Sequence, residues 1–228
     1  MSSRYRFYQW SVSPKRFDLL RKRLLEASFS EETGYGARLV RVADTEIEGR
    51  FIQKFLYEEQ EFSPSGAAAT VERTGFAVTS FILRPTPCGL VIVDPPRSVS
   101  SFMMFISTLL EHEVSVQAPT LNLMKFKRLV QSAFGRCRVS SVKISGALLA
   151  ENVIADIAVM DSQDALDRAL DLYPQHKACI GKIEIVLPAE LGSRSRLIVG
   201  KNGAIGTSLP RSNLEALWTS VEGSLQKK

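Results

Sequence analysis

Residues 89–97 read Gly-Leu-Val-Ile-Val-Asp-Pro-Pro-Arg, and this stretch organises the fold that we predict around it. Its apolar first half predicts a buried strand. Asp94 ends that strand, and the two prolines that follow block the sheet because proline has no amide hydrogen to donate. Ser98 is then predicted to cap an apolar helix that reaches Leu110. The centre of the chain is therefore expected to be a strand that leads through a turn into a buried helix.

Further strands flank this centre, each marked by aromatic residues, by β-branched residues or by alternation. They are expected at residues 5–12, 37–43, 50–56, 76–83, 138–144 and 182–187. In residues 37–43, arginines alternate with Leu39 and apolar neighbours, as in a strand with two different faces. Residues 58–75 show no clear period and are predicted to form a mobile loop.

The predicted helices lie between these strands. Ser13 and Pro14 supply a cap and a first-turn proline for the first of them. Others are expected at residues 119–133, at 212–220, and from a cap at Asp161 or Ser162 onward to Leu172. Runs of strands between helices predict an α+β fold with mostly antiparallel sheets, hairpins and packed helices. We expect a single domain over residues 1–228, or a subdivision near residue 119 into 1–118 and 119–228.

The composition is that of a globular protein, with 45% hydrophobic and 23% charged residues among 228. No apolar run approaches the length of a bilayer span, so we expect no membrane partner. Three cysteines without CxxC spacing predict reduced thiols and a cytoplasmic location. With two histidines and no ligand spacing, we expect no metal site. Asp164, Asp167 and Asp171 lie at helical spacing, which suits a solvated acidic face or a metal site.

The net charge of +5 is unevenly distributed. Residues 4–23 carry seven basic side chains and one acid, and residues 114–150 carry six basic side chains and no acid. Such segregation favours a polyanionic partner on one surface, although two solvated helix faces would produce the same pattern.

The stretch from Val93 to Ser98, which contains Val-Asp-Pro-Pro-Arg, resembles the catalytic loop of RNA 5-methyluridine methyltransferases. That resemblance implies that Asp94 positions a base and that a cysteine acts as nucleophile, for which Cys137 is the candidate, with its pKa lowered by the flanking arginines. The family also needs a glycine-rich turn before this strand to hold S-adenosylmethionine, and nothing before Gly89 supplies one. We therefore expect no cofactor and favour a structural role for Asp94.

Residues 197–205 contain Gly-Lys-Asn-Gly, which resembles the nucleic-acid-binding loop of a KH domain. The alternative is a hairpin across Asn202 and Gly203, a dipeptide typical of tight turns. We favour the hairpin because Gly206 and Pro210 would interrupt the helix that should follow a KH loop. In either case Lys201 is expected at an exposed tip.

Residues 82–110 also resemble, more loosely, a segment of RdgC-type recombination-associated proteins, with the same order of strand, turn, strand and long helix. The resemblance implies an α+β fold, a dimer, DNA binding without sequence preference and no catalytic site. It carries over no functional residue.

The preferred hypothesis is a non-enzymatic protein that binds nucleic acid, DNA rather than RNA, in recombination or phage–host conflict, as a homodimer or in a protein complex. The alternatives are an S-adenosylmethionine-dependent RNA methyltransferase and a protein-interaction subunit. The candidate phosphate contacts are Arg16, Arg21, Lys22, Arg23, Lys125, Lys127, Arg128, Arg136, Arg138, Arg194, Arg196 and Lys201.

Overall fold

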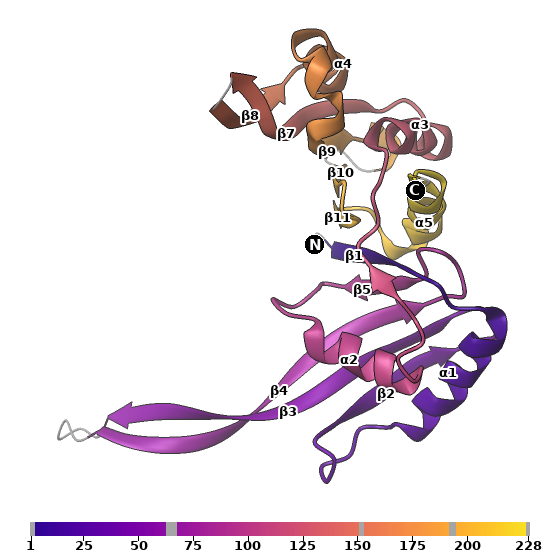
Figure 1. Ribbon diagram of the computed structural model, residues 1–228, viewed down its shortest axis with the longest axis vertical. Helices are drawn as coiled ribbons and strands as arrows, with labels where there is room; N and C mark the ends of the chain where they lie inside the picture. The colour runs from indigo at the N-terminus through magenta and orange to yellow at the C-terminus, as the bar shows by residue number, and fades with distance from the viewer. Residues whose placement is uncertain (1–2, 63–67, 151–152, 192–194, 227–228) are drawn as a thin grey trace. The chain divides into compact units, whose positions relative to one another are not determined.

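The computed structural model describes residues 3–62, 68–150, 153–191 and 195–226. The chain divides into two compact units (Figure 1). Unit 1 comprises Met1–Trp10, Thr86–Asp94 and Val116–Lys228, and unit 2 comprises Ser11–Pro85 and Pro95–Ser115. Each unit combines antiparallel strands with helices, so the predicted α+β class is confirmed. No helix in the described ranges is both long and apolar enough to cross a bilayer.

Unit 2 is built on three antiparallel strands and two helices. The strands are β2 (Tyr35–Val42), β3 (Ile47–Phe62) and β4 (Ala68–Leu83), with β3 in the middle. The helices are α1 (Pro14–Glu26) and α2 (Ser100–Leu109). The predicted start of α1 is confirmed, because the Ser13 hydroxyl accepts a hydrogen bond from the Arg16 N–H at 3.4 Å.

The unit 2 sheet has one face covered by α2 and an opposite face that the segment after α1 covers only in part. Phe51 and Phe81 are buried, and both pack against Phe102 of α2, with ring centroids 5.9 and 5.0 Å away. Figure 1 shows α2 lying across these strands. Side chains alternate along a strand, so the residues next to Phe51 in β3 point to the opposite face of the sheet. That opposite face carries the exposed Arg50 and the half-exposed Val78.

The predicted mobile loop at residues 58–75 is wrong, because β3 and β4 stay paired from Ile47↔Leu83 to Phe62↔Ala68. Two features support this long ribbon. The ring of Phe55 lies over Gly75, where an added Cβ would come within 2.6 Å of the ring. Arg73 forms ion pairs with both Glu59 and Glu61. The strand was missed because its polar residues on both faces hide the period of two. Residues 63–67 lie outside the described ranges.

Unit 1 is built on a larger antiparallel sheet in the order β5-β1-β11-β10-β9-β7-β8, with β6 paired to β1. The strands are β1 (Ser3–Trp10), β5 (Leu90–Val93), β6 (Val116–Gln117), β7 (Arg138–Ala150), β8 (Val153–Met160), β9 (Ile180–Val186), β10 (Arg196–Gly200) and β11 (Ala204–Thr207). The helices are α3 (Leu123–Phe134), α4 (Ala165–Leu172) and α5 (Leu214–Gly223), with 3-10 turns at Pro174–Cys179, Ala189–Leu191 and Arg211–Asn213. Strand β8 was not predicted.

The hairpin predicted within residues 196–208 is confirmed. Leu197 pairs with Thr207 and Val199 with Ile205, so the segment after the glycine loop is a strand and not the helix of a KH domain. Gly203 closes the turn with a φ of +79°, and an added Cβ would meet the Phe7 carbonyl oxygen at 2.9 Å. Glycine is therefore required there both by backbone conformation and by space.

Three predicted helix starts were wrong by a few residues. Helix α2 begins at Ser100 after Val99, although the Ser98 hydroxyl does accept from the Ser100 N–H at 3.4 Å. Helix α3 begins at Leu123 and is capped by Asn122 instead of starting at Pro119. Several polar residues near each start can act as a cap, and the tertiary contacts select among them.

Helix α4 is capped by Asp164 and not by Asp161 or Ser162. The Asp164 carboxylate accepts from the Leu166 N–H at 3.1 Å and from the Asp167 N–H at 3.4 Å. Asp161 instead closes the preceding turn, where its carboxylate accepts from the Gln163 N–H at 2.6 Å. The acidic face predicted for this segment is thus partly used for capping.

Candidate nucleic-acid interface

The arginines predicted on α1 are largely neutralised by acids of the same unit. They form the ion pairs Arg16–Glu113, Arg21–Asp44 and Arg23–Glu111. Arg23 also donates to the Leu109 carbonyl oxygen at 2.6 Å. Lys22 is exposed on the same helix. Three of the four candidates on α1 therefore fasten this helix to neighbouring segments.

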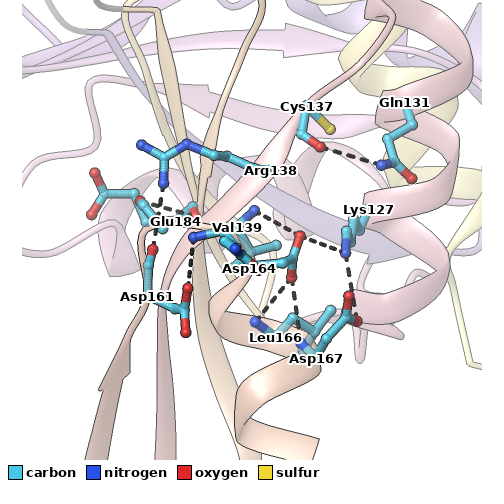
Figure 2. Close-up of polar contacts among 12 residues, drawn as sticks. Lys127, Gln131, Cys137, Arg138, Val139, Asp161, Asp164, Leu166, Asp167 and Glu184 are labelled. Carbon is cyan, nitrogen blue, oxygen red and sulfur yellow. Dashed lines mark hydrogen bonds and ion pairs between the residues drawn. The ribbon is translucent and has the colours of Figure 1, made fainter.

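Lys127 of α3 is committed to an internal ion pair in unit 1. Its ammonium lies 2.8 Å from the Asp164 carboxylate and 3.9 Å from that of Asp167 (Figure 2). Only 13% of the Lys127 side chain is exposed, against the outward orientation expected for a phosphate contact. Burial alone would raise the pKa of Asp164, but hydrogen bonds from Lys127 and from the Val139 N–H outweigh it and lower that pKa. This cluster joins α3, β7 and α4.

Other predicted contacts of unit 1 also have partners. Arg138 donates to the Ser162 carbonyl oxygen at 3.0 Å, and Arg196 pairs with Glu184 at 2.9 Å (Figure 2 includes Arg138 and Glu184). The prediction that Lys201 sits at an exposed tip is wrong. It is half-buried, and its ammonium donates to the Ala178 carbonyl oxygen at 3.1 Å.

The remaining candidates of unit 1 are exposed. Lys125 and Arg128 lie three residues apart on α3, and Arg136 follows the end of that helix. Arg194 lies outside the described residues. These three exposed cations give unit 1 a basic patch around α3.

The two residues singled out by the methyltransferase resemblance have settings that do not suit that chemistry. Asp94 is exposed at the end of β5, which pairs antiparallel with β1, and its carboxylate accepts from the Arg4 N–H at 2.9 Å. Cys137 is buried, and burial raises the pKa of its thiol despite the nearby Lys127. The predicted lowering of that pKa is wrong, and a protonated thiol is a poor nucleophile.

Two arginines that the sequence analysis did not predict as phosphate contacts lie on the face of the unit 2 sheet opposite α2. Arg38 of β2 lies directly opposite Arg50 of β3, and both side chains are exposed. Neither has an ion pair or side-chain hydrogen bond among the described residues. Like charges directly opposite each other on neighbouring strands destabilise a sheet. Arg38 and Arg50 thus place two like charges at opposed positions of the sheet, and no ion pair offsets either charge among the described residues.

Apolar side chains continue this face beyond the arginines. Ile52 of β3 lies opposite Val78, and the next pair on the face is Lys54 opposite Phe76. Phe76 is 49% exposed, and Phe29 contacts it edge-on with ring centroids 6.1 Å apart. We call the six side chains Arg38, Arg50, Ile52, Lys54, Phe76 and Val78 the open face.

A hollow of about 730 Å³ runs along this region, with Arg38, Ile52, Phe76 and Val78 in its lining. Glu31, from the segment after α1, also lines it and pairs with Lys54 at 3.3 Å. The open face thus offers two uncompensated guanidinium groups at one end and a half-exposed aromatic ring at the other. This combination can bind a phosphate and a flat apolar group together.

Sequence reasoning missed the open face although a signal for it existed. The alternation of arginines in β2 showed that one face of that strand is basic. The net charge of this segment does not reveal the basic face, because Glu46 and Glu48 lie between the arginines of β2 and Arg50 and offset their charge. Only the pairing of β2 with β3 brings Arg38 and Arg50 together.

Comparison with known proteins adds no constraint to this interface: neither a protein-family model nor a curated protein matches the chain.

Proposed function

We propose that this protein is a non-enzymatic nucleic-acid-binding protein whose main contact surface is the open face of unit 2. The observation that carries the proposal is the pair Arg38 and Arg50, opposed on neighbouring strands and without an acidic partner among the described residues. Guanidinium groups bind phosphate oxygens through two parallel hydrogen bonds, and a phosphate between two arginines removes their mutual repulsion.

The remaining parts of the proposal have separate support. Phosphate contacts carry no sequence information, so binding is largely sequence-independent. Lys125, Arg128 and Arg136 supply a further basic patch in unit 1. DNA is preferred to RNA, with a role in recombination or phage–host conflict, because of the resemblance of residues 82–110. The free cysteines Cys88, Cys137 and Cys179 support a cytoplasmic setting.

A salt series with labelled DNA tests the proposal. We expect binding at low salt that weakens steeply as salt rises, because phosphate contacts release counterions. The double variant Arg38→Gln, Arg50→Gln should bind about tenfold more weakly, and its salt slope should fall by about two, one for each lost phosphate contact. The matched control is Arg16→Gln, Arg21→Gln, whose arginines are already paired with acids and should change the affinity less than about twofold.

Two outcomes would contradict the proposal. One is the absence of binding to duplex and single-stranded DNA at low salt. The other is an equal loss in both double variants, which would mean that the open face has no special part. Calorimetry with S-adenosylmethionine separates the methyltransferase alternative, since that activity requires binding of the cofactor and the proposal expects none.

A further inference from the structure

We propose that the open face binds single-stranded nucleic acid in preference to duplex, with a base stacked on Phe76 and phosphates on Arg38 and Arg50. This inference rests on the proposed function and specifies its substrate. The observation that carries it is the combination, on one partly exposed face, of two opposed arginines without an ion pair among the described residues and a half-exposed aromatic ring.

The side chains of the open face form rows across the strands, each row made of residues opposed on neighbouring strands. Arg38 and Arg50 form one row, Ile52 and Val78 the next, and Lys54 and Phe76 the third. Successive rows are two residues apart along β3, so the arginines and the ring are separated by roughly 13 Å of strand. A backbone held at the arginines can therefore place its next bases over the apolar rows.

The setting of Phe76 suits a stacking platform. The Phe29 ring packs against the Phe76 ring in a T-shaped pair, and 49% of the Phe76 side chain stays exposed. Lys54 beside it is held in an ion pair with Glu31, so a base over the ring meets no free charge from that lysine. An aromatic face stacks any base, because every base has a π face.

The same layout is poorly suited to a duplex. In a duplex the bases are stacked inside, and a protein surface meets the phosphate backbones first. The apolar rows of Ile52, Val78 and Phe76 would then face phosphates without gaining any contact. In a single strand the bases are free to turn toward the sheet, as in other proteins that bind bases on an exposed sheet.

A protein partner is the competing occupant of an exposed apolar surface. The opposed arginines favour a polyanion, because an apolar partner surface would have to bury two like charges. A protein partner on this face predicts that the protein binds neither the single strand nor the duplex.

The experiment compares binding of a mixed-sequence DNA oligonucleotide with binding of its duplex of equal length. Wild type should bind the single strand about tenfold more tightly, since stacking of one base contributes on that scale. Phe76→Leu should lose about tenfold on the single strand and little on the duplex. Phe76→Trp should keep the preference for the single strand over the duplex. Thermal unfolding of both Phe76 variants checks that the fold is intact.

The matched control is Phe55→Leu. Phe55 lies on the same ribbon with a similar exposure of 45%, but it points to the other face. Its replacement should leave both affinities unchanged. A single strand with 2-aminopurine gives an independent readout, because stacking on Phe76 should quench its fluorescence in wild type and not in Phe76→Leu.

The outcomes separate this inference from the proposed function. Equal affinity for both forms with a neutral Phe76→Leu, while Arg38→Gln, Arg50→Gln still weakens binding, overturns the single-strand preference alone. No binding to either form overturns both. An equal effect of Phe55→Leu and Phe76→Leu overturns the assignment of the base to the open face.

Discussion

Two sets of arginines in unit 2 have opposite surroundings although their side chains are chemically identical. Arg16, Arg21 and Arg23 on α1 each lie against a carboxylate. Arg38 and Arg50 occupy directly opposed positions on neighbouring strands. The first set contributes to the attachment of α1, whereas the second set costs stability unless an anion is bound.

The difference teaches that the density of basic residues along a chain is a poor guide to where an anion binds. The segment with the most basic residues contributes ion pairs, and a segment with dispersed arginines contributes the uncompensated charge. Stability and binding should therefore respond in opposite ways to changes in cations paired with an acid and in cations without an acidic partner.

The largest effect on stability is expected at Lys127, whose side chain is only 13% exposed and pairs with Asp164. Lys127→Ala should lower the free energy of unfolding by about 1–3 kcal/mol, because it leaves the Asp164 carboxylate without its cation. Urea unfolding gives the value. Lys125→Ala, an exposed lysine on the same helix, is the control and should stay within about 0.5 kcal/mol of wild type. Equal effects of the two variants would show that the ion pair has no structural role.

Charge reversal should change stability in opposite directions in the two sets of arginines. Arg38→Glu turns a repulsive pair with Arg50 into an attractive one and should raise the free energy of unfolding by about 0.2–1 kcal/mol, while it weakens nucleic-acid binding. Arg23→Glu places a carboxylate beside Glu111 and should lower the free energy of unfolding by a similar amount. Denaturation curves and salt-dependent binding of both variants check this contrast, which fails if both variants are destabilised alike.

The smallest effect concerns how the stability contributed by the Lys127–Asp164 ion pair depends on pH. The pKa of Asp164 is lowered in the folded state, so its ionised form adds stability above the ordinary carboxyl pKa of about 3.9. That contribution is lost as the pH falls through the lowered pKa. The stability gap between wild type and Asp164→Asn should thus be present at neutral pH and shrink in acid. Unfolding measured across acidic pH tests this, and a gap that stays constant with pH would contradict it.

Parts of the fold that depend on neighbouring residues were predictable. The cap at Ser13 and the hairpin around Gly203 follow from the residues at each turn, because capping and left-handed backbone are local properties. Where several residues could cap a helix, the predicted start was wrong by a few residues, as for the helix that Asp164 caps. The β3–β4 ribbon was missed because its regularity depends on cross-strand contacts such as Phe55 over Gly75.

The class of fold, the turns and the excess of positive charge were readable in the linear chain, since each depends on composition or on residues a few positions apart. The partner of each charge was not. Arg23 meets Glu111 and Arg38 meets Arg50 only after distant segments have paired in one register. A shift of one residue in that register would send Arg50 to the covered face. The basic surface was therefore foreseeable as a property of the chain, and its location depended on long-range strand pairing.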